Sequence, residues 1–293
     1  MLSAYQLRWG INQWLGFLKD KEIPVLPRTK ALILALSDQC AEARERLGAR
    51  QLLDIVYGDP YLSLKTLRSA ETRRSRRLGQ ETTTALAAIL QVGFDDLVAL
   101  VSSSATSDAT LKPCNDCESR AVLAASIARA WARQRADVLP EEVALAALLS
   151  EIGELLLWQF APELPQKAEE ELASGRAFRA VKAQQQAVGF TFKQMTLALV
   201  EAWQLPNIIG LLIKGTDTPR ANIARLAADT ARHIVTDDRH PAIPADLVNI
   251  RNVISHAAFA TLAAPLPIAD DYKSSVLEAV MADTASTSPE EDM

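Results

Sequence analysis

Residues 140–158 of the sequence read PEEVALAALLSEIGELLLW, and the apolar pattern of this stretch decides the fold. A proline followed by two glutamates suits a helix start, because proline fits the first helical position and carboxylates complement the positive end of the helix dipole. The polar side chains fall together on one side of such a helix, at Ser150, Glu151 and Glu154. The remaining apolar positions recur with the spacing of a buried helical face, at Leu145, Leu148, Leu149, Ile152, Leu155 and Leu156. The stretch therefore predicts one core helix with a polar stripe.

The overall composition indicates an all-helical protein. Of the 293 residues, 49% are hydrophobic but only 5% are aromatic, and the excess lies in alanine and leucine, which favour helices over strands. A formal net charge of −5 gives no global attraction to nucleic acid or to an anionic membrane. No apolar run approaches the roughly 20 residues that span a bilayer, and the N-terminus lacks the pattern of a secretion signal. We therefore expect a cytoplasmic protein that does not bind membranes.

The chain has three cysteines, so they cannot all be paired in disulfides. Cys114 and Cys117 have the spacing of a zinc or redox motif, but a structural zinc site needs four ligands and no second pair exists. We interpret them as two small residues in a loop, with metal or redox function as the alternative.

Residues 1–21 predict an amphipathic helix. Its apolar stripe runs through Leu7, Ile11, Trp14 and Leu18. Two interpretations remain open. The stripe either packs back on its own domain or forms a face for a protein partner or a second copy of the chain, since large aromatic residues are enriched at such surfaces.

Short motifs along the chain resemble those of a known family. In the first part these are IPVLP at 23–27, Asp59-Pro60 with Leu62 and Lys65 after it, and Gly93 ahead of Leu97. In the second part they are Ile152-Gly153, Val188-Gly189 and a Trp203-x-Leu205-Pro206 run. In this order they resemble an HDOD domain, a non-catalytic relative of the HD-type metal phosphohydrolases, over residues 22–218.

The resemblance implies an all-α, two-part helical bundle of the HD-like type. We divide the chain into the first helix (1–21), an N-terminal helical half (22–112), a degenerate HD-like half (113–218), C-terminal accessory helices (219–282) and a disordered acidic tail (283–293).

In relatives that keep the HD ligand set, imidazoles and a carboxylate hold metal ions that activate water. The resemblance places those positions on residues none of which is a histidine: Ala121, Ser150, Glu151, Phe192, Thr216 and Asp217. Asp229 falls where the last aspartate of an HD domain lies. We therefore expect no catalytic residue, no metal and no cofactor. The three actual histidines lie beyond this pattern, and we expect structural roles for them: His233, His240 and His256.

An arginine cluster follows the Asp-Pro motif, where the family usually continues with Ala-Asn-Ser-Ala. It consists of Arg68, Arg73, Arg74, Arg76 and Arg77. Five guanidinium groups in ten residues repel one another unless they are solvated, so we expect an exposed helix end and loop. The alternative is a contact with phosphate, nucleotide or nucleic acid.

The resemblance implies a bacterial, non-catalytic signalling or regulatory module that binds a signalling protein partner or a small nucleotide. The groove between the halves and the first helix are the candidate surfaces, and a homodimer remains open. A degenerate metal-dependent phosphohydrolase is the alternative, and nucleic-acid binding through the arginine cluster is the third interpretation.

Overall fold

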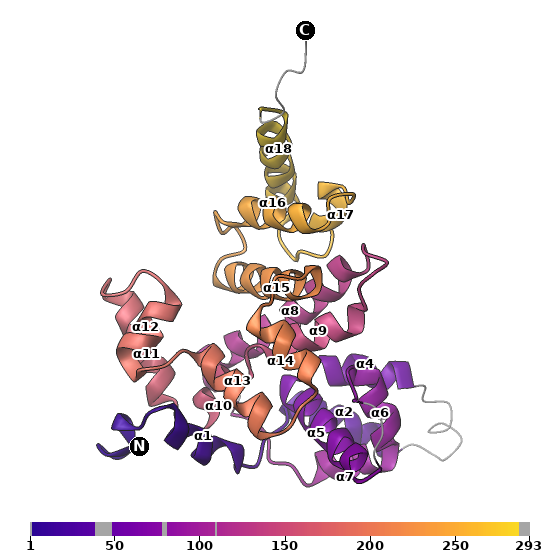
Figure 1. Cartoon of the computed structure of the whole chain (residues 1–293), viewed down its shortest axis with the longest axis vertical. Helices are drawn as coiled ribbons and strands as arrows, with labels where there is room; N and C mark the ends of the chain where they lie inside the picture. The colour runs from indigo at the N-terminus through magenta and orange to yellow at the C-terminus, as the bar shows by residue number, and fades with distance from the viewer. Residues whose placement is uncertain (1, 39–48, 78–80, 109, 287–293) are drawn as a thin grey trace.

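The computed structural model describes residues 2–38, 49–77, 81–108 and 110–286, and within these ranges it consists of helices joined by short connections. The all-α prediction is confirmed. Extended pairing in these ranges is confined to a single bridge, in which the Val25 amide donates to the Ala105 carbonyl at 2.9 Å and the Ser107 amide donates to the Val25 carbonyl at 2.9 Å. Figure 1 shows an elongated molecule with the C-terminal helices at one end and the N-terminal half at the other.

The N-terminal half is organised around the Asp59-Pro60 corner. Its elements are η1 (Gln6–Arg8), α1 (Ile11–Lys19), α2 (Pro27–Ser37), α4 (Ala49–Tyr57), α5 (Pro60–Arg77), α6 (Ala85–Val92) and α7 (Phe94–Ser102). Asp59 is fully buried. One of its carboxylate oxygens accepts from the Leu62 amide at 2.9 Å and caps α5, and the other accepts from the Leu26 amide at 2.8 Å. This side chain therefore fixes the start of α2 against the start of α5.

Helix α1 packs back on the domain. Trp14 and Leu18 are fully buried in the main hydrophobic cluster, and Leu7 and Ile11 are partly buried against it. Each large apolar side chain that is buried contributes roughly 1.5–3 kcal/mol to folding. The stripe is therefore an internal face in this structure and not an exposed partner surface.

The second half begins with the long helix α8. Its helices are α8 (Lys112–Ala132), α9 (Pro140–Leu149), α10 (Ile152–Phe160), α11 (Glu163–Ala173), α12 (Ala180–Val188), α13 (Phe192–Ala202) and α14 (Asn207–Lys214). Because α8 starts at Lys112, Cys114 and Cys117 are buried helical residues, and the loop interpretation is wrong. Helices α11 and α12 form a hairpin that projects from the body (Figure 1).

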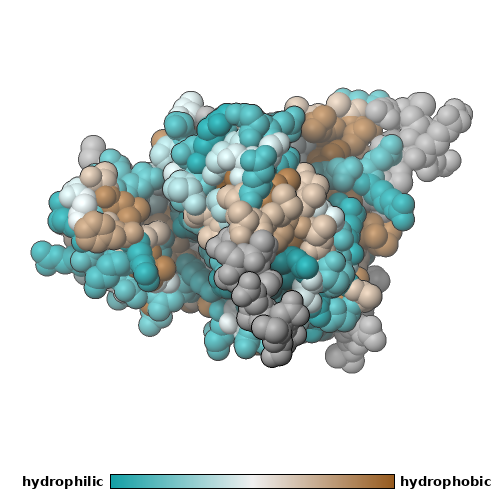
Figure 2. Space-filling view, turned by 90° about the horizontal axis from the view of Figure 1, so that it is seen from above, coloured by the Kyte–Doolittle hydropathy of each residue, from teal (hydrophilic) through white to brown (hydrophobic). Residues whose placement is uncertain are grey.

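Exposed apolar side chains lie on this hairpin. The Phe178 side chain is 93% exposed and that of Val181 is 57% exposed. Figure 2 shows brown apolar surface among hydrophilic residues on the side to which the hairpin projects.

The predicted core helix is buried, but it is two helices rather than one. Helix α9 ends at Leu149 and α10 begins at Ile152. At the break, the Thr196 hydroxyl of α13 lies 3.0 Å from both the Ser150 carbonyl oxygen, to which it donates, and the Gly153 amide, from which it accepts. Backbone groups that a continuous helix would pair internally are thus paired with a side chain of another helix.

The C-terminal helices are α15 (Pro219–Thr236), α16 (Ile243–Val253), α17 (Phe259–Ala263) and α18 (Asp270–Ser286). Helix α15 packs along α8 and α9, so it is an integral part of the second half rather than an accessory. A second hydrophobic cluster joins α8 and α9 to α15, α16, α17 and α18. Helix α18 continues into the first residues of the expected disordered tail, and residues 287–293 lie outside the described ranges.

Among the described residues, 140–160 are long and apolar enough to cross a membrane, and 83% of the most apolar window is buried inside the protein. A second such stretch arises only if α6 and α7, which are bent by 94° at Gly93, are counted as one span.

Candidate functional site

A cavity of about 890 Å³ opens at the break between α9 and α10. Its walls come from the first turns of α12 and α13, the end of α14 and the middle of α15. The charged and polar lining includes Ser150, Glu151, Glu154, Arg179, Lys182, Gln184, Thr191, Lys193, Arg225, Asp229, Arg232 and His233. The cavity therefore lies where the resemblance places the degenerate HD positions.

Glu151 lies at the bottom of this site, and two guanidinium groups hold its carboxylate. Its Oε1 accepts from Arg232 at 2.8 Å and its Oε2 accepts from Arg120 at 3.2 Å. The Glu151 side chain is 6% exposed. Burial by itself would raise the pKa of Glu151, but Arg232 and Arg120 outweigh it and hold the pKa below its usual value. Glu151 is therefore an ionised, internally neutralised group.

Glu154 completes a buried chain of charges. Its carboxylate accepts from the same Arg120 nitrogen at 2.6 Å, so Arg120 bridges Glu151 and Glu154. Two carboxylates and two guanidinium groups then alternate from Glu154 through Arg120 and Glu151 to Arg232. Arg120 comes from α8, the carboxylates from the α9–α10 junction and Arg232 from α15. The sequence placed both glutamates on the polar stripe of the core helix, and in the structure this stripe is buried, with the Glu151 side chain 6% and the Glu154 side chain 12% exposed.

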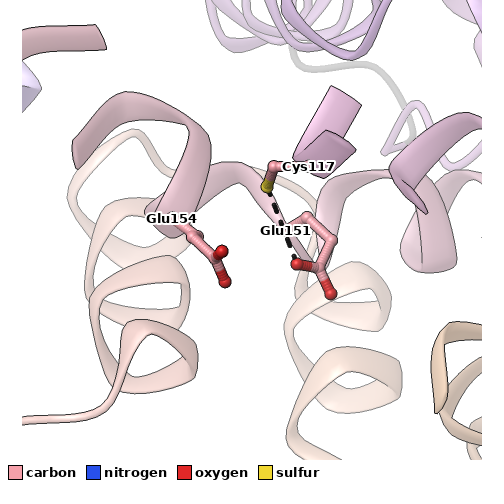
Figure 3. A group of neighbouring side chains, drawn as sticks. All are labelled: Cys117, Glu151 and Glu154. Carbon is pink, nitrogen blue, oxygen red and sulfur yellow. Dashed lines mark hydrogen bonds between the residues drawn. The ribbon is translucent and has the colours of Figure 1, made fainter. Parts of the chain in front are cut away.

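One group of side chains has the spacing of a metal site. Ligand atoms of Cys117, Glu151 and Glu154 all lie within 4.8 Å of one another. Figure 3 shows the three side chains converging from α8 and the α9–α10 junction, with the Cys117 thiol donating to Glu151 at 3.8 Å.

These residues do not fit a metal ion. The Arg120 guanidinium, which stays charged at physiological pH, already contacts both carboxylates where a cation would bind them. Burial raises the pKa of the Cys117 thiol well above its usual value, so the thiolate that a metal requires is disfavoured. Burial likewise raises the pKa of Cys114 to about 12. A divalent ion would have to displace an arginine from two carboxylates.

The structure brings together some of the degenerate positions that the sequence analysis singled out. Ser150, Glu151 and Phe192 line the cavity. Ala121 is buried in α8, next to Arg120. Thr216 and Asp217 lie between α14 and α15 and are not among the lining residues.

Asp229 and His233 also line the cavity, each with a partner from its own part of the fold. Asp229 pairs with Arg225 one turn earlier in α15, at 3.3 Å. His233 Nδ1 lies 2.7 Å from an Asp246 carboxylate oxygen, and its ring stacks on that of His240 with centroids 4.5 Å apart. His256 contacts the backbone carbonyl of Gln134. The His233 contacts join α15 to the start of α16, and the His256 contact joins the C-terminal region to the end of α8.

The arginine cluster lies in the C-terminal part of helix α5, which agrees with the expected helix end, and Arg68 to Arg77 are helical rather than part of a loop. Arg73 donates to the carbonyls of Gln91 and Val92 and pairs with Asp96. Arg74 pairs with Glu71 at 2.6 Å, and the Arg68 guanidinium lies over the Trp203 ring at 4.5 Å. Arg68 and Arg73 thus hold α5 to neighbouring elements, whereas the Arg74–Glu71 pair lies within α5. The side chains of Arg76 and Arg77 lie outside what the structure describes.

The sequence alone did not identify Arg120 and Arg232 as the partners of Glu151, nor Cys117 as its neighbour. Arg120 follows Cys117 by three residues, so both side chains lie on one face of α8, and this spacing was the available signal. Arg232 gave no comparable signal, because it comes from a helix that was assigned to the accessory region.

The fold and the site can now be compared with known proteins. The model of the HDOD domain family matches residues 25–219. The chain belongs to the HDOD domain family. The HDOD match covers α2 to α14 and ends where α15 begins, so the Glu151 side of the site lies inside it and Arg232 lies beyond it. No curated protein sequence matches this HDOD chain significantly.

Two solved structures share the fold of this HDOD protein. A virulence factor from Campylobacter jejuni is 16% identical with a TM-score of 0.68, and the match covers 90% of this chain and 98% of that one. The MmoQ response regulator from Methylococcus capsulatus is 19% identical with a TM-score of 0.60, over 88% of this chain and 99% of that one. At these identities the likeness concerns the fold.

Proposed function

We propose that this HDOD protein is a non-catalytic regulatory module of a bacterial cytoplasmic signalling pathway, which acts by binding a protein partner. The observation that carries the proposal is the position of Arg120. Its guanidinium bridges Glu151 and Glu154 at 3.2 and 2.6 Å and neutralises the carboxylates that a catalytic cation would need. Hydrolysis of a phosphate ester by an HD-type site requires several nitrogen and oxygen ligands around a metal ion with an open position for water. This chain supplies an internal salt-bridge network instead.

The description of one structural neighbour supports a signalling role. The solved relative from Methylococcus capsulatus is described as a response regulator. For this chain, a role in signalling is consistent with a site that is closed to metal chemistry and with a projecting hairpin that exposes Phe178.

The test measures metal binding and hydrolysis by the full chain. Protein purified without chelators should contain no stoichiometric transition metal, its melting temperature should not rise with Mn²⁺, Mg²⁺ or Fe²⁺, and it should not hydrolyse bis(p-nitrophenyl) phosphate with any of these ions. Metal-dependent turnover that is lost in Glu151→Gln but kept in Glu170→Gln, on the exposed face of α11, would overturn the proposal.

A further inference from the structure

The cavity carries an excess of positive charge. Five basic side chains line it against three carboxylates, Glu151, Glu154 and Asp229. Two of the basic groups already have partners, because Arg225 pairs with Asp229 and Arg232 pairs with Glu151. The third carboxylate, Glu154, is paired with Arg120 from behind the cavity wall. All three carboxylates are therefore neutralised.

Three basic side chains of the lining form no salt bridge in the described part of the chain: Arg179, Lys182 and Lys193. Lys193 interacts with the charge of Asp229, which is already paired with Arg225. Arg179 and Lys182 come from the start of α12, and Lys193 comes from the first turn of α13. The Lys193 ammonium donates to the Lys214 carbonyl at 3.2 Å, which leaves two of its protons free. Two separate helices thus bring basic side chains that form no salt bridge to one cavity.

Apolar side chains form another part of the lining. Ala146 and Ala147 of α9, Val181 of α12, and Leu212 and Ile213 of α14 contribute to it. A volume of about 890 Å³ lies within the roughly 300–1,000 Å³ of small-molecule sites. A cavity with cations at two walls and methyl groups between them suits a ligand with an anionic group and an organic body.

We infer that this cavity binds a small phosphorylated organic molecule through Arg179, Lys182 and Lys193, without a metal ion and without hydrolysing it. The inference rests on the proposed non-catalytic function. Guanidinium and ammonium groups match the several oxygens of a phosphate or diphosphate group, and Arg232, whose side chain is 38% exposed, offers a further donor face. The bound molecule would bridge α12, α13 and α15 and so stabilise the position of the projecting hairpin.

The test uses the full chain with three probes: ADP, inorganic pyrophosphate and adenosine. Melting temperature and isothermal titration calorimetry should show binding of ADP and of pyrophosphate at millimolar concentration or below, with an affinity that falls as salt rises. Adenosine, which lacks the anionic group, should not shift the melting temperature.

A matched pair of double variants assigns binding to the cavity. Arg179→Gln with Lys193→Gln should weaken ADP binding at least about tenfold, because two charged hydrogen-bond donors are lost. Arg133→Gln with Lys112→Gln removes the same charge at exposed positions outside the cavity and should bind ADP like the wild type. Both variants change surface side chains, so both should fold, which the melting temperature without ligand verifies.

The outcomes separate this inference from the proposed function. The anion site would be overturned if neither ADP nor pyrophosphate raised the melting temperature, or if the two double variants bound ADP equally well. Either result would leave the non-catalytic proposal standing. ADP that binds and is hydrolysed with added metal would instead contradict the non-catalytic proposal, while binding that depends on Arg179 and Lys193 would still support the site.

Discussion

Oε1 of Glu151 accepts a hydrogen bond from Nη2 of Arg232 at 2.8 Å, although the two residues are 81 positions apart in the sequence. This contact joins the break in the core stretch to the helix that follows the family match. The other oxygen of Glu151 is held by Arg120, so both carboxylate oxygens belong to one salt-bridge network.

Replacing Glu151 by glutamine should lower the free energy of unfolding by about 3 kcal/mol. The change leaves two partly buried guanidinium groups without their shared counter-charge, which is the costly way to break an ion pair with a buried carboxylate. Urea denaturation at neutral pH measures the difference. Glu170→Gln, on the exposed face of α11, should change stability by less than about 0.5 kcal/mol. Equal stability of the two variants would show that the network contributes nothing.

The contribution of Glu151 to the free energy of unfolding should disappear in acid. Its pKa is below the usual value in the folded protein, so the folded state favours the ionised form relative to the unfolded chain. The stability difference between wild type and Glu151→Gln should be complete above about pH 5, since an unfolded glutamate titrates near 4.3. It should shrink as pH falls through the native pKa. Denaturation curves at a series of pH values test this, and a difference that stays constant from neutral pH to pH 3 would contradict it.

Removing Arg120 should open the site to metal. Arg120→Ala leaves Glu154 and one oxygen of Glu151 unpaired, next to Cys117, and should cost about 3 kcal/mol of stability. Ligand atoms of the three residues lie close enough for one ion. We therefore expect Zn²⁺ to raise the melting temperature of this variant but not of the wild type. Arg133→Ala, an exposed change near the end of the same helix, serves as the control, and a zinc response equal to that of the control would argue against Arg120 as the group that excludes metal.

Gly153 should tolerate no side chain. A Cβ at this position would lie 2.6 Å from the Phe192 carbonyl oxygen and 2.7 Å from the Thr196 amide nitrogen, both of which are backbone atoms. Gly153→Ala should therefore destabilise the protein by about 3 kcal/mol or prevent folding.

Gly16→Ala is the matched control for that change. Gly16 lies in helix α1 with nothing within 4 Å of the added carbon, so alanine should raise stability by up to about 1 kcal/mol. Thermal melts of both variants suffice. A Gly153→Ala protein as stable as the wild type would mean that α10 and α13 are not in close contact.

Local pattern predicted much of the helical architecture. The i, i+3, i+4 spacing in residues 140–158 located the buried centre, and the Gly58-Asp59-Pro60 run located the corner where α5 begins. Residue identity also predicted which ligands are missing, because the alanine, serine and phenylalanine side chains at the positions that the resemblance assigns to the HD ligands carry no imidazole.

Only the tertiary structure decided what occupies the site instead. The break at Ser150 depends on the Thr196 hydroxyl of α13, and the charge on Glu151 depends on Arg120 and Arg232, which lie 31 and 81 residues away. The physical reason is that helical periodicity is a property of neighbouring residues. A buried ion pair between distant helices depends on how those helices pack, so sequence spacing predicted the helices but not the salt-bridge network around Glu151.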